Sequence, residues 1–309
     1  MTPFCAAVDW GTSSFRIWLL SADGNILDER RSDEGMSRAR EIGFDAVLER
    51  HLTALGAEAA LPVIICGMAG ARQGWREAGY LDTPADLAQI IGNALVIDGY
   101  KRDVRILPGI AQRDPNAPDV MRGEETQLLG LASDDIRSGL VCMPGTHSKW
   151  VTLEDGKVAH FSTYMTGELF TVVSAHSILR MAIEGNAEVT PGDPAFLAAV
   201  KTAYAAPQAI SNLLFSIRSS QLLGFSPLSD GAARLSGLLL GLELAGAIGR
   251  AAPAGDVVLV GSGRLGALYE SALMGMGLQV RYCEADEAVR RGLMSAARAF
   301  WGAEGGRNG

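Results

Sequence analysis

Residues that bind metals or form disulfides are scarce in this sequence, which has only four cysteines and four histidines among 309 residues. The cysteines lie far apart, mostly within apolar runs, and form no CxxC pair: Cys5, Cys66, Cys142 and Cys283. We therefore expect buried thiols in a reducing compartment, without disulfides and without a zinc centre.

The sequence also lacks a basic tract and an uninterrupted membrane span. Lys and Arg number 27 against 35 Asp and Glu, a formal net charge of −8, which disfavours binding to nucleic acid or anionic membrane. The most apolar stretch, 235–248, contains three glycines and Glu243, so it predicts a buried helix. The first residues, MTPFCAAVDW, have no basic residue before the apolar run and predict a strand rather than a signal peptide. We expect a cytoplasmic protein with no nucleic-acid or membrane partner; its oligomeric state stays open, a homodimer included.

Apolar residues, by contrast, are plentiful. They make up 48% of the chain, whereas charged residues make up 20%. A chain of this length and composition can build a sizeable core in about two domains.

The chain contains an internal repeat. An apolar run ends at Asp9, and the sequence GTSS begins at Gly11; the sequence GTHS begins at Gly145, 134 residues later. Each copy is followed by a second apolar run, an Asp-Gly turn and a third short segment, which predicts three strands joined by two hairpins. Two α/β lobes are therefore expected, 1–135 and 136–309.

The rest of each half predicts helices and further strands. In the first half, helices are expected at 41–57 and 84–95 and strands at 62–66 and 104–107. In the second half, strands are expected at 257–260 and 278–283, and helices at 167–184, 194–203, 206–223, 231–248, 263–274 and 286–301. Asp286 is the expected N-cap of the last helix, and the tail 305–309 is expected to fray.

The two Gly-Thr turns are candidate phosphate-binding loops. Glycine lets the backbone approach a ligand, and successive N–H groups with hydroxyls form a donor surface for phosphate oxygens. Either turn alone is an ordinary hairpin, but the pair predicts two loops that hold a polyphosphate between the lobes. Asp9 could hold Mg²⁺ through water, and Lys149 could add positive charge. The loop residues are Gly11, Thr12 and Ser13 in the first copy and Gly145, Thr146, His147 and Ser148 in the second.

A third motif follows the apolar run 257–260. The residues GSGRLG, with Gly261, Ser262 and Gly263 at the start, match the dinucleotide pattern GxGxxG, and Glu284 follows 18 residues after Gly266. Only 48 residues follow Gly261, too few for a dinucleotide-binding sheet. The motif favours an adenosine-binding turn, with tight packing of helix on strand as the alternative.

Together these segments resemble a known family. Two phosphate hairpins and a late glycine-rich turn are similar to the actin-like ATPase superfamily, whose ribonuclease H-like lobes enclose a nucleotide cleft. The segments DWGTSSFRIWLL, GMAGARQGW, VMRGEETQLLG, PGTHSKWV and YMTGELF, with VLVGSGRLG near the end, resemble the 2-dehydro-3-deoxygalactonokinase family. The resemblance implies transfer of phosphate from ATP, with Mg²⁺, to the terminal (C6) hydroxyl of 2-dehydro-3-deoxy-D-galactonate.

Phosphoryl transfer to a hydroxyl requires a residue that orients or deprotonates it. Glu124 and Glu125 are the candidates, although acidic residues are also common in first helical turns. A similar Gly-Glu-Glu segment carries a catalytic carboxylate in polyphosphate phosphatase relatives, which favours Glu124. Asp9 is the rival carboxylate.

The acidic substrate predicts an arginine partner for its carboxylate. Arg72 is the first candidate and Arg122 the second, and Thr166 and Glu168 could contact hydroxyls at a helix start.

Three other functions remain open at this point. One is a different enzyme on the same fold, either a kinase for another sugar acid or a polyphosphate phosphohydrolase. The others are an ATP-switching chaperone or filament module, and an NAD-binding enzyme. The choice between galactonate and gluconate epimers also remains open.

Overall fold

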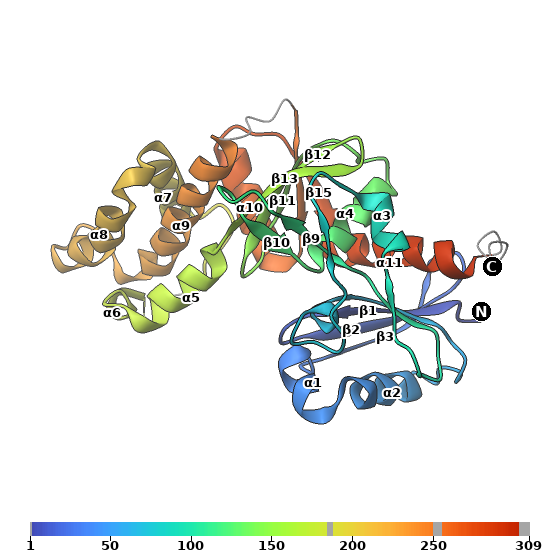
Figure 1. Ribbon diagram of the computed structural model, residues 1–309. Coiled ribbons are helices and arrows are strands. Elements are labelled where there is room, and N and C mark those ends of the chain that lie inside the picture. Colours follow the sequence, from blue (N-terminus) through green and yellow to red (C-terminus); the bar gives the residue numbers. More distant parts are fainter. Residues whose placement is uncertain (1, 184–187, 250–254, 303–309) are drawn as a thin grey trace. The chain divides into compact units, whose positions relative to one another are not determined.

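The computed structural model describes residues 2–183, 188–249 and 255–302, and the chain forms two compact units (Figure 1). Unit 1 contains 2–138, 153–160 and the C-terminal residues from 285; unit 2 contains 139–152 and 161–284. The expected division into 1–135 and 136–309 differs from this chiefly in the last helix, which packs within unit 1.

The main sheet of unit 1 has the order β3-β2-β1-β4-β8-β7. Strand β1 pairs antiparallel with β2 and parallel with β4, so a three-stranded meander is extended by parallel strands. The bounds are β1 (Cys5–Trp10), β2 (Phe15–Leu20), β3 (Ile26–Ser32), β4 (Val63–Gly67), β7 (Leu95–Val96) and β8 (Val104–Ile106).

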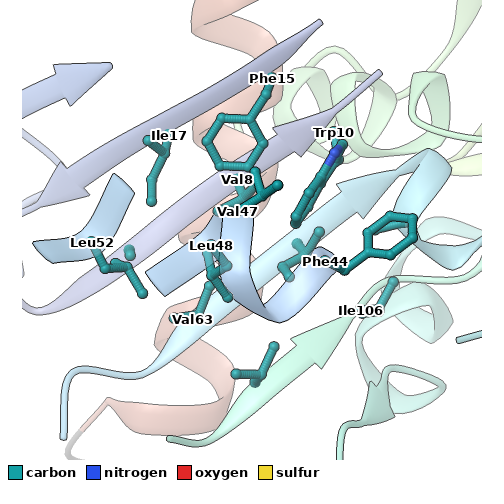
Figure 2. Close-up of a cluster of buried hydrophobic side chains, with 14 of the residues drawn as sticks. Val8, Trp10, Phe15, Ile17, Phe44, Val47, Leu48, Leu52, Val63 and Ile106 are labelled. Carbon is teal, nitrogen blue, oxygen red and sulfur yellow. The ribbon is translucent and has the colours of Figure 1, made fainter. Parts of the chain in front are cut away.

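One face of this sheet is covered by a helix with a regular apolar stripe. Helix α2 (Phe44–Ala54) buries Phe44, Val47, Leu48 and Leu52, a spacing that places them on one face. Figure 2 shows these side chains against Val8, Trp10, Phe15, Ile17, Val63 and Ile106. This cluster forms the core beneath the first hairpin.

Unit 1 also holds several short elements and the last helix. The strands β5 (Tyr80–Asp82), β9 (Gly109–Gln112) and β10 (Asp119–Met121) form a small sheet, and β6 (Ala85–Asp86) pairs with the start of β13. The helices are α1 (Met36–Ile42), η1 (Met68–Gly70), α3 (Leu87–Gly92), α4 (Glu124–Ala132) and α11 (Ala285–Trp301).

Unit 2 repeats the arrangement of unit 1. The strand order β15-β14-β11-β12-β13 again places the third, second and first strands beside the fourth and fifth. The bounds are β11 (Gly139–Met143), β12 (Ser148–Glu154), β13 (Lys157–Tyr164), β14 (Val257–Gly261) and β15 (Val280–Glu284). The repeat predicted from the two GTxS turns is confirmed, as is the α/β class.

The helices of unit 2 pack around an apolar helix, α9 (Gly231–Ile248). Its Gly237 and Gly241 lie against α7, where a Cβ atom would come within 2.3 Å of the Phe196 and Val200 carbonyl oxygens. The stretch Leu228–Ile248 is long and apolar enough to span a membrane, but most of it is buried in the unit, as expected for a core helix. The other helices are α5 (Thr166–His176), α6 (Arg180–Ile183), α7 (Pro194–Ala205), η2 (Pro207–Ala209), α8 (Ile210–Leu222), η3 (Leu228–Asp230) and α10 (Gly263–Gly275).

Some boundaries differ from the expected ones. The helix predicted at 41–57 is two helices divided at Gly43, whose φ of 103° breaks the helical path. The helix predicted at 84–95 is shorter because residues 85–86 form β6 and Asp86 caps α3. The helix predicted at 167–184 divides after His176, and its last residue lies outside the described residues, as does the tail 305–309. Asp286 is not an N-cap, because α11 begins at Ala285.

Candidate active site

Asp9 lies near the end of β1 and forms an ion pair with Arg16 on the adjacent strand. Asp9 Oδ2 accepts a hydrogen bond of 2.5 Å from Arg16 Nη2, and the side chain of Asp9 is 14% exposed. Arg16 Nη1 donates to Asp286, in the first turn of α11, which also pairs with Arg31 at 3.0 Å. Residues from both ends of the chain therefore order the predicted metal ligand.

The charges of this group influence one another. Burial raises the pKa of the Asp9 carboxyl, and the positive charge of Arg16 acts in the opposite direction. Burial alone would lower the pKa of Arg16, but Asp9 and Asp286 raise it overall. Arg16 therefore stays protonated between the two carboxylates.

Two glycines bring the loop after β4 against the start of α4. Gly67 has φ 87°, and a Cβ there would lie 2.6 Å from the Trp10 carbonyl oxygen. Gly123 has φ 113°, and its Cβ would lie 3.6 Å from the Cα atom of Gly67. Both positions require glycine, since an L side chain rarely adopts such φ values. This close approach places Glu124 and Glu125 near the ends of β1 and β4.

Glu124 and Glu125 differ in their surroundings. Glu125 is fully buried and accepts hydrogen bonds from the Gly123 N–H at 2.7 Å and the Thr126 hydroxyl at 3.0 Å. Burial, and then the charge of Glu124, raise the pKa of Glu125 to about 8. Glu124 is half-buried, and its Oε2 accepts the Arg122 backbone N–H at 3.1 Å. Glu124 is thus the more accessible carboxylate. Glu125 stabilises the start of α4 through its buried hydrogen bonds to Gly123 and Thr126.

The guanidinium of Arg122 has hydrogen-bond donors that no described residue accepts. Its Nη2 donates to the Gly79 carbonyl at 2.9 Å, and its guanidinium lies 4.3 Å from the centre of the Tyr80 ring. Its Nε and Nη1 are buried and have no hydrogen-bond partner among the described residues. Nη1 lies beside Gly70, so Arg122 meets the loop that also carries Arg72, which is exposed.

In unit 2 the start of α5 packs against the second hairpin. A Cβ atom at Gly167 would lie 2.7 Å from the Gly145 carbonyl oxygen, and the Glu168 N–H donates to Thr146 O at 3.1 Å. His147 Nε2 and Glu168 Oε2 are 2.5 Å apart. The structure therefore joins Glu168 to the second hairpin. Lys149 and Ser148 are buried in β12.

A buried network that the sequence did not reveal lies behind this hairpin. Glu243 in α9 accepts hydrogen bonds of 2.8 Å from the Trp150 indole and the Tyr269 hydroxyl. Tyr269 Oη lies 2.6 Å from Ser148 Oγ, and Thr166 also bonds to Glu243. Burial raises the pKa of Glu243, and these donors act against it. The only sequence signal was one acid in a strongly apolar helix.

The glycine-rich turn and the second hairpin share a cavity of about 480 Å³. Ser262 precedes α10 in extended conformation, and Gly263 has φ 52°. Arg264, Leu265, Leu268 and Tyr269 line the cavity on the α10 side, and Gly145, Thr166 and Gly167 line it on the hairpin side. The sheet beside it is mixed, whereas a dinucleotide-binding sheet is mostly parallel, so the sheet does not favour the NAD-binding alternative.

Comparison with known proteins identifies the family. The model of the 2-keto-3-deoxy-galactonokinase family matches residues 9–296. The chain belongs to this family. It is 56% identical over 299 residues to "Probable 2-dehydro-3-deoxygalactonokinase DgoK1" of Rhizobium meliloti (strain 1021), covering 96% of this chain and 98% of that protein. It is 36% identical over 302 residues to 2-dehydro-3-deoxygalactonokinase of Escherichia coli (strain K12), covering 97% and 99%.

A solved structure agrees with these sequence relatives. A crystal structure from Sinorhizobium meliloti, likewise assigned to a 2-dehydro-3-deoxygalactonokinase protein, superposes with a TM-score of 0.94 at 56% identity, covering 96% of this chain and 99% of that one. Membership of the 2-keto-3-deoxy-galactonokinase family confirms the expected class of enzyme, a phosphotransferase with an alcohol acceptor, and implies the use of ATP.

Proposed function

We propose that this protein transfers a phosphoryl group from ATP to the terminal (C6) hydroxyl of 2-dehydro-3-deoxy-D-galactonate. Two relatives, at 56% and 36% identity, are named as that kinase, and the similarity covers nearly their full lengths. The structural feature that best supports an acidic acceptor is Arg122, whose two buried, unpartnered nitrogens lie in the same turn as Glu124. An arginine with free donors can bind a substrate carboxylate while the adjacent glutamate acts on the hydroxyl.

In this reaction Glu124 orients or deprotonates the acceptor hydroxyl, and Glu125 holds the turn through Gly123 and Thr126. Arg122, with Arg72, binds the substrate carboxylate. Thr166 and Glu168 stay candidates for contacts to substrate hydroxyls.

Each hairpin, taken by itself, is a candidate phosphate-binding loop, and we assign the adenosine to the glycine-rich turn of unit 2. Backbone N–H groups and hydroxyls of the two hairpins would bind phosphate oxygens, with His147 and Lys149 beside the second. The cavity that α10 and Gly145 line would receive the adenosine. The proposed residues are Gly11, Thr12, Ser13, Gly145, Thr146, His147, Ser148, Lys149, Gly261, Ser262 and Gly263.

The described residues suit Mg²⁺ only at a site with a single carboxylate, with water and phosphate as the other ligands. No group of three His, Cys, Asp or Glu side chains suited to a metal occurs among the residues that the structure describes, and Asp9 already pairs with Arg16. Mg²⁺ commonly uses one or two carboxylates, retained waters and substrate phosphates. We therefore propose that Asp9 holds the ion through water, where it would neutralise phosphate charge.

The substrate is tested by measuring ADP release with the two epimeric acids, 2-dehydro-3-deoxy-D-galactonate and 2-dehydro-3-deoxy-D-gluconate. We expect a higher kcat/KM with the galactonate derivative. A preference for the gluconate derivative or another sugar acid would overturn the assignment of the substrate. ADP release that is equally fast without any acceptor would overturn the kinase itself and favour a phosphohydrolase.

The role of Glu124 is tested by Glu124→Gln. Loss of a general base lowers kcat by about 10²- to 10⁴-fold, while the KM for ATP should change little. Glu41→Gln, an exposed glutamate on α1, is the matched control and should keep full activity. If Glu124→Gln stays active, Glu124 is not the base and Glu125→Gln becomes the decisive variant.

The role of Arg122 is tested by Arg122→Met beside Arg122→Lys. Loss of a charged hydrogen bond costs roughly 1.5–3 kcal/mol, so the KM for the sugar acid should rise about 10- to 100-fold. The KM for ATP should stay unchanged, and lysine should restore part of the affinity. Equal KM values for the sugar acid in wild type and Arg122→Met would exclude this contact.

A further inference from the structure

Large apolar side chains are exposed in unit 2 on α6, on α8 with the turn after it, and on η3, and α6 contacts both α8 and η3. Six of them, each between 53% and 80% exposed, define what we call the α8 patch: Met181, Phe215, Leu222, Leu223, Phe225 and Leu228. Both α6 and α8 contact the core helix α9, and Figure 1 shows them on the same side of unit 2 as α9. Exposed apolar groups of this size gathered in one place are unusual on a protein that stays monomeric.

The patch is built on ordered backbone. Gln221 Nε2 donates to the Ala182 carbonyl at 3.0 Å and so ties the end of α8 to α6. The Phe225 N–H donates to Ser220 O at 2.8 Å, and Arg234 donates to the hydroxyls of Ser216 and Ser226. The turn after α8 is therefore fixed, and it still holds the Phe225 ring 80% exposed.

Helical spacing contributes a continuous face to the patch. Phe215 and Leu222 are seven residues apart on α8, which places them on the same side of the helix. Ile217, by contrast, is fully buried against the unit. Helix α8 thus has one apolar side in the core and a second apolar side that no described residue covers.

Charge is almost absent from this surface segment. The twenty residues 210–229 include one charged side chain, Arg218, although a fifth of the whole chain is charged. Depletion of charged residues is the compositional mark of the core of a protein interface. Asp230 and Arg234, which line a pocket with Phe225, flank this segment. The charges near the patch are therefore few and of both signs, which favours neither a strongly charged partner nor an anionic membrane.

We infer that the α8 patch is the contact surface of a homodimer, in which two copies of this chain meet through the same residues. A twofold contact must complement itself, which an uncharged apolar surface does without repulsion, even though each chain carries a net charge of −8. Six such side chains expose on the order of 100 Å² each, roughly 600 Å² together. With a surrounding rim, this approaches the 800 Å² or so that each partner buries in a standard interface.

This inference is independent of the proposed substrate, because it concerns assembly alone. The molar mass of the full chain is measured by light scattering during size-exclusion chromatography, from about 1 to 50 µM. We expect twice 32.6 kDa for the wild type. Leu223→Glu and Phe225→Glu should each place a charge in the interface and give the monomer mass.

Met274→Glu is the matched control, since Met274 is 61% exposed on α10 and lies outside the patch. It should remain dimeric. Circular dichroism and ADP release should show that all three variants are folded and active.

A monomeric wild type at 50 µM would overturn the inference, as would a dimer that survives both patch variants or one that Met274→Glu also dissociates. A monomer that sediments with phosphatidylcholine vesicles would assign the patch to a lipid surface and would equally overturn it.

Discussion

The Trp150 indole N–H donates to Oε1 of Glu243 at 2.8 Å, and both side chains are buried in unit 2. Glu243 Oε2 accepts from Tyr269, so one carboxylate serves two donors from different elements. Through the contact of Tyr269 with Ser148, α9 is coupled to the second hairpin.

Two replacements of Glu243 should therefore have unequal effects on stability. Glu243→Gln keeps one oxygen for Trp150, a pure donor, and can turn its amide toward Tyr269, whose hydroxyl also accepts. Glu243→Leu leaves the Trp150 N–H buried without an acceptor, at a cost of about 1–3 kcal/mol. Urea unfolding followed by tryptophan fluorescence should rank the leucine variant as the less stable. Equal midpoints would mean that the network contributes nothing.

The pKa of Glu125 predicts a dependence of stability on pH. Because its pKa is about 8 in the folded protein against a model value of 4.5, the unfolded chain releases this proton at lower pH. The contribution of Glu125 to the free energy of unfolding is therefore largest below about pH 4.5. It falls as the pH rises toward 8, with a slope of at most about 1.4 kcal/mol per pH unit.

Unfolding free energies from pH 5 to 8 test this dependence. Glu125→Gln cannot ionise, so its stability relative to the wild type should increase steadily with pH. Glu41→Gln, an exposed glutamate on α1, is the control and should follow the wild-type slope. Parallel curves for Glu125→Gln and wild type would show that Glu125 is ionised throughout the range.

Helices α4 and α11 cross at two glycines. A Cβ atom at Gly130 would lie 1.9 Å from Ala288 O, and one at Gly292 would lie 1.9 Å from Thr126 O. Gly292→Ala should therefore force the helices apart and lower the free energy of unfolding by about 1–3 kcal/mol. Because α4 carries Glu124 in its first turn, kcat should fall as well. Gly92→Ala at the end of α3, where a Cβ meets nothing within 4 Å, should be neutral or slightly stabilising.

The close approach of Gly266 to Tyr282 predicts that substitutions at these two positions have non-additive effects on the free energy of unfolding. A Cβ atom at Gly266 would lie 2.4 Å from the Tyr282 hydroxyl and 3.2 Å from Gly261 C. Gly266→Ala should destabilise the protein by about 1 kcal/mol, and part of that cost should disappear in a Tyr282→Phe background. A double-mutant cycle of urea unfolding measures the coupling. Strict additivity would show that Tyr282 moves aside without cost.

Much of the fold could be predicted because its pattern is local. The two GTxS turns and their Asp-Gly hairpins revealed the repeat, and the apolar stretch starting at Gly231 gave α9 its observed bounds. Strands of two to four residues, such as β7 and β9, escaped prediction because they are too short for a hydrophobic period. Helix α1 was merged with α2 because the left-handed conformation of Gly43 is not visible in composition.

The site was harder to predict because its contacts join distant parts of the chain. Arg16 and Asp286 are 270 residues apart, and Asp286 looked like an ordinary cap. The choice between Glu124 and Glu125 also depends on burial, which only the folded turn defines. The glycine-rich turn and the second hairpin were both found in the sequence, but their shared cavity was not.

The last helix belongs to the first unit. On a ribosome, residues 1–138 emerge long before α11, which supplies the surface that α4 packs against and the carboxylate that Arg16 binds. The nascent N-terminal half is therefore incomplete until α11 has been synthesised, and truncation before Ala285 would remove a part of unit 1 although it leaves residues 1–138 untouched.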